Sequence, residues 1–341
     1  SDSLVTHIME LNRELQSNDA FNTTSTRTHA RILYRHLIQP LEEKLIPFDQ
    51  LMIIPDDELS YIPFEFLIDS SDQYLIKKFA ISFNYSCSLL KKPPAQKQKR
   101  NYSILAYAPY SGDVPPGSLP VLPASKKEVE GLKGMLLIGN RATKESFIQS
   151  APGFNILHLA THAKANDKEP LQSYIAFYPV HPDSPAKDRL YIPDIYSLSL
   201  PSTTLVILSA CETGAGQLVK GEGLISLSRA FSYAGCANII TSQWKADDEA
   251  TAYIARRLHR YLENGMAIAS SLQKAKLDYL DDGAIDGRLK SPAYWAHLRL
   301  TGQFETKTNR SYYWLLLLLL PVILAYYIKK IRPNKSRNSI S

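Results

Sequence analysis

The feature that most constrains the fold is a short apolar run that ends in a cysteine and a cluster of glycines. Residues 203–216 read TTLVILSACETGAG, so an unbroken aliphatic run leads almost directly to Cys211. An apolar run of this length, bounded by turn residues, predicts a strand that is buried on both faces of a sheet. In open α/β sheets, functional side chains collect at the carboxyl ends of such strands. The sequence therefore predicts that Cys211 lies at a functional edge of a sheet.

Similar strand patterns alternate with amphipathic helices along most of the chain. We expect strands at 51–55, 74–83, 102–110, 155–160, 174–178, 205–209 and 238–243, and helices at 4–15, 30–46, 128–137, 222–234, 248–264 and 267–280. Gly235 and Gly265 follow two of these helices, in the position where glycine favours a helix end. This alternation predicts an α/β fold in which a mostly parallel sheet is flanked by helices on both faces.

The chain length of 341 residues allows one large domain or two small ones. We expect a helical segment at 1–29 that ends an upstream region, followed by a domain at 30–302. This domain is divided into an N-terminal part at 30–90, a polar linker at 91–100 and a core at 101–302. After it we expect a second linker at 303–310, an apolar segment at 311–328 and a basic tail at 329–341. The chain begins with Ser1 and shows no secretory signal, so we expect that its natural start is missing.

Composition excludes some classes of function. The formal net charge is +6, but part of the excess lies in the basic tail, and no basic stripe with interleaved aromatic residues is visible. A nucleic-acid partner is therefore not expected. Three cysteines are too few for a disulfide framework, and they leave the redox compartment open.

The apolar segment 311–328, SYYWLLLLLLPVILAYYI, contains no charged residue. Aromatic residues lie at both of its ends and Lys329 and Lys330 follow it, which is typical of a membrane interface. A bilayer core needs about 20 apolar residues, with a minimum near 17. The sequence thus predicts a single-pass C-terminal transmembrane helix with the lipid bilayer as partner. The side of the membrane stays open, because the positive-inside tendency and tail anchoring favour opposite orientations.

The motif HLATHA at 158–163 supplies a second candidate for chemistry. His158 and His162 would share one face of a strand, with His162 at the strand end. His162 precedes Cys211 by about 50 residues, which is the spacing of caspase-type cysteine proteases. At the ends of neighbouring parallel strands, the imidazole could deprotonate the thiol or protonate a leaving amine. A buried structural cysteine and a core histidine are the plainer alternative.

The glycine-rich segment 211–223, CETGAGQLVKGEG, suits a peptide-binding cleft, because glycine lets the backbone approach a substrate closely. Glu212 in this segment is a candidate substrate-binding residue. A phosphate-binding loop is excluded, because no Gly-Lys-Ser/Thr follows the glycines. A zinc site on His158 and His162 is not expected either, because the HExxH arrangement needs a helix and a glutamate after the first histidine. We therefore expect no metal and no cofactor.

The segment SQWKADDEAT at 242–251 also follows a predicted strand end. Trp244 could form the wall of a pocket, and Asp247 or Asp248 could neutralise a basic substrate side chain. Aspartate at a helix start is also the usual N-cap, so a purely structural role for either residue stays open.

Taken together, these motifs resemble those of the CHAT domain family, which comprises caspase-like cysteine peptidase domains that often follow tetratricopeptide repeats. The resemblance is carried by HLATHA, LVILSACETGAG, KGEGLISLSRAFSYAGCANIITSQWKADDEAT and SPAYWAHLRLTG, and upstream by IIPDDELSYIPFEFLI, ILAYAP and LPASKKEVE. It extends over about residues 30–302 and so rests on several motifs.

The resemblance implies a caspase-like three-layer sandwich with Cys211 as nucleophile and His162 as general base or acid. It also implies an oxyanion hole made by the backbone N–H groups of Cys211 and Ala163. The implied partners are a protein or peptide substrate and an upstream repeat region that binds a regulatory protein. Two residues depart from the family pattern, because glycine is usual at the positions of Ala163 and Asp57.

Three hypotheses follow. The first is a membrane-anchored caspase-like cysteine endopeptidase that cleaves protein substrates through a Cys–His dyad, after lysine or arginine if an aspartate binds the substrate. The second is a catalytically silent CHAT module that acts as an interaction or signalling scaffold at the membrane. The third is a hydrolase of other acyl substrates that uses the same dyad.

Overall fold

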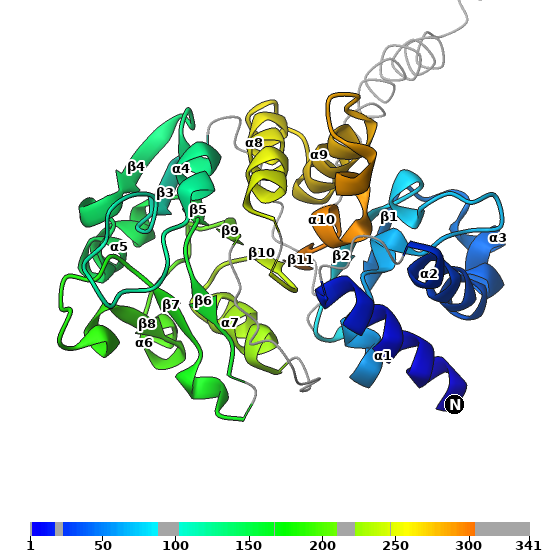
Figure 1. The fold of residues 1–341 in the computed structure, drawn as a ribbon, viewed down its shortest axis with the longest axis horizontal. Coiled ribbons are helices and arrows are strands. Elements are labelled where there is room, and N and C mark those ends of the chain that lie inside the picture. The colour runs from blue at the N-terminus through cyan, green and yellow to red at the C-terminus, as the bar shows by residue number, and fades with distance from the viewer. Residues whose placement is uncertain are drawn as a thin grey trace, which may run out of the picture. The chain divides into compact units, whose positions relative to one another are not determined.

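The computed structural model describes residues 2–17, 23–87, 102–166, 168–209, 222–245 and 247–303. Their centre is an eight-stranded sheet in the order β1-β2-β11-β10-β9-β5-β3-β4 (Figure 1). The strands are β1 (Gln50–Ile53), β2 (Ala80–Phe83), β3 (Ile104–Ala108), β4 (Gly134–Ile138), β5 (Ile156–Leu159), β9 (Leu205–Leu208), β10 (Asn238–Ser242) and β11 (Leu298–Gly302).

All neighbouring strands in this sheet pair in parallel, except that β10 and β11 are antiparallel. The sheet therefore consists of two parallel blocks of opposite direction that meet at the β10–β11 pair. The prediction of a mostly parallel sheet is confirmed. β5 and β9 are direct neighbours near the centre, and His158 pairs in register with Ile207.

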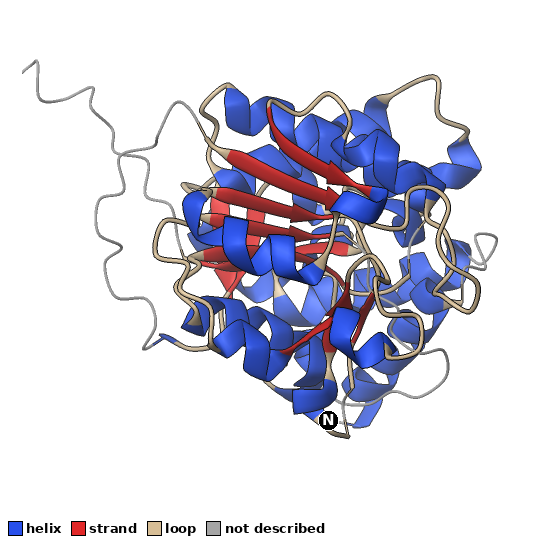
Figure 2. Cartoon of the chain, turned by 90° about the vertical axis from the view of Figure 1, so that its left-hand side faces the viewer, coloured by secondary structure: helices blue, strands red, loops and turns tan. Residues whose placement is uncertain are grey.

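Helices cover both faces of the sheet (Figures 1 and 2). They are α1 (Asp2–Gln16), α2 (Thr23–Leu37), α3 (Glu42–Leu45), α4 (Pro123–Val129), α5 (Lys144–Ser150), α6 (Ile192–Tyr196), α7 (Glu222–Tyr233), α8 (Asp248–Glu263), α9 (Ile268–Asp281) and α10 (Pro292–Trp295). Strand residues alternate between two apolar cores. In β9, Leu205 and Ile207 pack in the core that includes α8 and α9, whereas Val206 and Leu208 pack in the core that includes α5, α6 and α7.

A second, three-stranded antiparallel sheet follows β5 immediately. It consists of β6 (Ala163–Lys164), β7 (Tyr174–Ala176) and β8 (Arg189–Tyr191). Of these strands only β7 corresponds to a predicted one. β6 and β8 are short, and their partners are defined only by the fold.

Several helix ends follow the expected signals. Gly235 and Gly265 adopt φ values of 110° and 77° after α7 and α8, as predicted. The predicted helix at 128–137 is wrong, because α4 ends at Val129 and the following residues turn at Gly131, which has a φ of 86°. The apolar residues beyond this turn form β4, whose outer side is partly exposed at the sheet edge.

The predicted C-terminal transmembrane helix is not supported. Within the described ranges, every helix is too short or too polar to span a membrane, and the residues predicted to do so, 311–328, lie outside these ranges. The longest of the described helices, α8, has 16 residues and carries charged side chains, whereas a span needs about 20 mostly apolar residues. This finding contradicts the predictions of a C-terminal transmembrane helix and of single-pass localisation.

Candidate active site

The candidate site lies at the carboxyl ends of β5 and β9. His162 follows the end of β5, and Ser209 is the first residue after β9. Because these strands are parallel neighbours, the segments that carry the two predicted catalytic residues leave the sheet at the same edge. Cys211, Glu212 and the glycine segment lie outside the described residues, so the predicted dyad is traced here through His162.

His162 is buried beside the loop that follows β3. Its Nε2–H donates to the backbone carbonyl of Pro120, with an N···O distance of 2.7 Å. The Tyr110 ring meets the imidazole edge to face, with ring centroids 4.8 Å apart. Since Nε2 must carry a proton to donate to a carbonyl, a neutral His162 has its lone pair on Nδ1. Nδ1 is therefore the nitrogen that can accept a proton.

The loop that supplies this carbonyl is fixed at both ends. The N–H of Leu122 donates to the Tyr110 carbonyl at 2.7 Å, and the Tyr110 hydroxyl donates to the Phe177 carbonyl at 3.0 Å. A backbone carbonyl has no residue-type signature, so sequence reasoning missed Pro120 as a partner of His162.

Ala163 stands where the resemblance to the CHAT domain family implies a glycine. It lies in β6, pairs with Ile175, and is buried in the core beneath the small sheet. A strand conformation accommodates any L-residue. The methyl group of Ala163 therefore introduces no backbone strain at this position.

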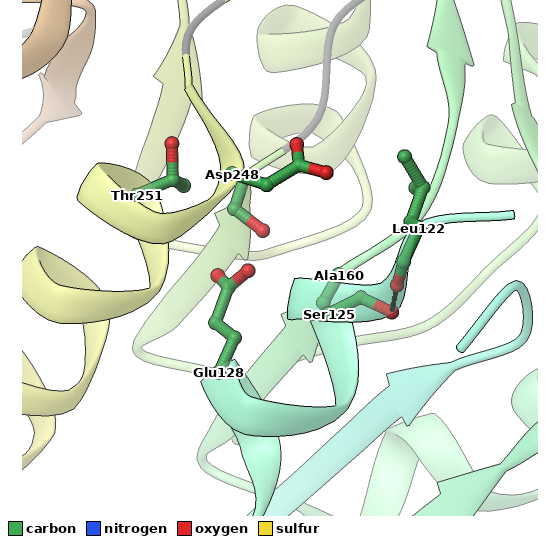
Figure 3. A pocket seen from close by; sticks show the side chains of 7 residues that line it. Leu122, Ser125, Glu128, Ala160, Asp248 and Thr251 are labelled. Atoms are coloured by element: carbon green, nitrogen blue, oxygen red, sulfur yellow. Dashed lines mark hydrogen bonds between the residues drawn. The ribbon is translucent and has the colours of Figure 1, made fainter. Parts of the chain in front are cut away.

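A small pocket of about 20 Å³ lies at the same sheet edge (Figure 3). Its lining residues are Leu122, Ser125, Glu128, Ala160, Ser209, Asp248 and Thr251. Glu128 points into it from α4, and Asp248 approaches from the start of α8. Ala160 and Ser209 are each two residues before a predicted catalytic residue. The pocket is therefore adjacent to the place where chemistry was predicted.

The two candidate aspartates have different environments. The Asp247 carboxylate accepts a hydrogen bond from the N–H of Ala250 at 2.9 Å, so Asp247 is the N-cap of α8. Burial raises the pKa of the Asp248 carboxyl, as do the negative charges of Asp247 and Glu128. Lys245 and His162 oppose this rise in pKa, which places Asp248 within electrostatic reach of His162.

Trp244 faces the protein core. It is 1% exposed, and its indole Nε1–H donates to the Ala293 carbonyl at 2.9 Å. Trp244 is thus not among the residues that line the small pocket.

Sequence reasoning also missed a buried polar cluster behind the pocket, which we call the pocket cluster. It consists of Glu128 from α4, His158 from β5 and His259 from α8. Nε2 of His158 lies 2.7 Å from Oε1 of Glu128, and Nδ1 of His158 lies 2.8 Å from Nε2 of His259. The histidine that was considered as a zinc ligand thus binds a carboxylate and a second imidazole. Only the fold brings these three distant segments together.

Comparison with known proteins identifies the family. Residues 27–303 match the family described as "CHAT domain". The chain belongs to the CHAT domain family. The match includes the described sheet and the elements that carry His162, Glu128 and Asp248.

The curated relatives of this CHAT domain include tetratricopeptide repeat protein 28 of mouse and of human. Each is 25% identical over 334 residues, which cover 82% of this chain and 13% of the relative. The chain therefore spans a small part of these proteins.

Comparison with solved structures gives matches of low sequence identity. The complex of Porphyromonas gingivalis RgpB pro- and mature domains has a TM-score of 0.48 and 10% identity, covering 86% of this chain and 74% of that chain. The Saccharomyces cerevisiae separase–securin complex also has a TM-score of 0.48, with 12% identity over 74% of this chain and 15% of that chain.

Proposed function

We propose that this CHAT domain is a cysteine endopeptidase that cleaves protein substrates with Cys211 as nucleophile and His162 as the proton carrier. The observation that supports it best is the environment of His162. Its ring is held by Pro120 and Tyr110 at one edge of the sheet. The neighbouring parallel strand β9, which precedes Cys211 in the sequence, ends at the same edge. Membership of the CHAT family agrees with this assignment.

In the proposed mechanism, Nδ1 of His162 takes the proton from the Cys211 thiol. The resulting imidazolium is stabilised because its Nε2–H already donates to the Pro120 carbonyl. The thiolate attacks the substrate carbonyl carbon, and the backbone N–H groups of Cys211 and Ala163 stabilise the oxyanion. The C–N bond then breaks as Nδ1–H protonates the leaving amine. Water, deprotonated by His162, hydrolyses the acyl-enzyme and restores the thiol.

The acidic pocket supports a substrate with a basic side chain at the cleavage site. Asp248 and Glu128 bring two carboxyl groups to one small cavity, and Asp248 lies within electrostatic reach of His162. Such a cavity favours lysine or arginine over neutral side chains, since a cation relieves the repulsion between the carboxylates. Asp247, as a helix cap, is assigned no part in this binding.

A peptidyl chloromethyl ketone with lysine next to the reactive carbon tests this function. We expect it to label the chain at Cys211, and we expect labelling to disappear in Cys211→Ala and in His162→Ala. The experiment is best done in a Cys87→Ala background, because Cys87 is exposed and could react nonspecifically.

Cys236 provides a matched control. Its thiol is buried and donates to the Asn238 carbonyl at 3.1 Å, and burial raises its pKa to about 12. Cys236→Ala should therefore leave labelling unchanged. If labelling persists in Cys211→Ala, or is absent from the parent protein, the peptidase proposal is wrong.

A further inference from the structure

The pocket cluster is almost completely removed from solvent. Glu128, His158 and His259 are 4%, 0% and 1% exposed. A carboxylate at such a position normally has a cationic partner, because an uncompensated charge in a protein interior is unfavourable. Whether His158 provides that positive charge depends on where the protons of the cluster lie.

The hydrogen-bond partners of His158 and His259 indicate which of their ring nitrogens carry a proton. Nε2 of His158 must carry a proton, because it faces the Glu128 carboxylate. If His158 were also protonated at Nδ1, Nε2 of His259 would accept that hydrogen bond, and the proton of His259 would lie on its own Nδ1. This Nδ1 is buried and has no hydrogen-bond partner among the residues that the structure describes. A buried N–H without an acceptor is unfavourable. The hydrogen bonds thus favour two neutral imidazoles and leave the negative charge on Glu128.

The hydroxyl groups that line the pocket all donate their protons to backbone carbonyl groups. Ser125 donates its proton to the Leu122 carbonyl at 2.6 Å, and Thr251 donates to the Asp247 carbonyl at 2.8 Å. Ser209 donates to the Leu159 carbonyl at 3.4 Å.

Each hydroxyl has only one proton, and Oγ1 of Thr251 also lies 3.1 Å from Nε2 of His297. What each hydroxyl offers a ligand is therefore a remaining lone pair. Together with the carboxylates of Glu128 and Asp248, the polar side chains of the pocket offer acceptors. They therefore suit a ligand group that is cationic and donates several hydrogen bonds.

The size of the pocket selects among such groups. A single water needs about 10–15 Å³ on the same measure, so a cavity of about 20 Å³ holds one compact group. A lysine ammonium is compact and has three donors, whereas an arginine guanidinium is a wider planar fork. The dimensions therefore favour lysine.

From this geometry we infer that Glu128 is a specificity-determining residue that makes the domain select lysine over arginine and over neutral side chains at the cleavage site. In this inference, His158 and His259 are positioning residues that hold the Glu128 carboxylate toward the pocket. The inference rests on the proposed peptidase function and extends it to two side chains that do not touch the substrate.

Three peptidyl reporters that differ only in lysine, arginine or norleucine before the scissile bond test this inference. Norleucine is the matched neutral analogue of lysine. We expect the parent domain to prefer lysine to norleucine in kcat/KM by at least about 100-fold, as for a buried charge that loses its partner. Arginine should be less favoured than lysine by about tenfold.

Glu128→Gln should reduce the lysine-to-norleucine ratio by at least about tenfold, because its amide turns donors toward the pocket and only the Asp248 carboxylate remains. Glu130→Gln is the matched control, since Glu130 is exposed just beyond α4, and it should keep the ratio. His158→Leu should also lower the ratio, by about tenfold, whereas His158→Gln should restore it, because the glutamine N–H can replace Nε2–H.

The possible failures can be distinguished. If the norleucine reporter is cleaved in a Cys211-dependent way and Glu128→Gln leaves the ratio unchanged, the specificity inference is wrong and the peptidase proposal stands. If arginine is preferred, the size argument is wrong. If none of the reporters is cleaved and none of the corresponding chloromethyl ketones labels Cys211, the peptidase proposal and the inference both fail.

Discussion

Two polar clusters, each with one member in a strand of the central sheet, can be compared directly. The pocket cluster contains Glu128, and a second cluster, which we call the core cluster, contains Glu65, Lys276 and Arg299. The Lys276 ammonium pairs with the Glu65 carboxylate and donates to the Leu298 carbonyl at 2.5 Å. Arg299 donates to the Ser60 carbonyl at 2.6 Å and stacks 3.6 Å above the Phe83 ring.

The two clusters differ in charge compensation. Burial raises the pKa of Glu65 and lowers that of Lys276, and each group opposes the shift of the other. The core cluster thus satisfies its own charges, whereas the pocket cluster turns one charge toward a cavity. Burial of an ionisable group is common to both clusters and does not identify function. The useful criterion is a charge that no cation within its own buried cluster compensates.

The largest expected effect concerns the core cluster. Lys276→Met leaves the Glu65 carboxylate buried without its cation, so we expect the free energy of unfolding to fall by about 3–5 kcal/mol. Urea denaturation followed by circular dichroism measures this change. The double variant Glu65→Gln/Lys276→Met should recover most of the loss. A single variant as stable as the parent would show that the core cluster is not self-compensated.

The second prediction concerns pH and His297, which lies beside the core cluster. Burial, and then the charge of Lys276, lower the pKa of His297 from 6.5 to about 3. The unfolded chain therefore binds more protons between these values, and the free energy of unfolding falls as pH decreases through this range. His297→Gln should reduce the slope by about 1.4 kcal/mol per pH unit. An unchanged slope would contradict a buried, neutral His297.

The third prediction applies the same stability measurement to the pocket cluster. Glu128→Gln removes a charge that has no cation within the cluster, and the glutamine carbonyl still accepts from His158. We therefore expect the free energy of unfolding to change by less than about 1.5 kcal/mol, in contrast to Lys276→Met. A loss as large as that of Lys276→Met would mean that Glu128 is compensated internally, and the comparison between the clusters would fail.

The smallest expected effect is at Asp57. Asp57 has a φ of 43°, in the left-handed region that favours glycine, and it begins the 3-10 turn Asp57–Tyr61, whose Ser60 carbonyl accepts from Arg299. Asp57→Gly should relieve strain and raise the free energy of unfolding by up to about 1 kcal/mol. Thermal unfolding measures it. A destabilised variant would show that the Asp57 side chain stabilises the fold by more than its backbone strain destabilises it.

Residue patterns predicted the central part of the fold well. The strand before Cys211, its neighbour before His162 and the helix that begins at Asp248 all form as expected, because short apolar runs and caps are local signals. The helix at 128–137 was wrong because β4 is a half-exposed edge strand, whose mixed pattern resembles that of an amphipathic helix.

The candidate site was only partly predictable. His162 was predicted from its motif. Cys211 lies outside the described residues, so the structure does not give the distance between the two. Asp247 and Asp248 are adjacent and chemically identical, so only the start of α8 decides which one caps the helix and which one lines the pocket. His259 had no visible signal, since its role depends on α8 packing against β5.

The hydrogen bond between His162 and Pro120 has one further consequence. Because the acceptor is a main-chain oxygen, every amino acid at position 120 supplies it. The orientation of the His162 imidazole thus depends on the backbone path of the loop. A single substitution at position 120 does not remove the acceptor. Saturation mutagenesis of this loop should therefore find sensitive positions where the loop is anchored, such as Tyr110, and tolerance at position 120 to residues that keep the loop's course.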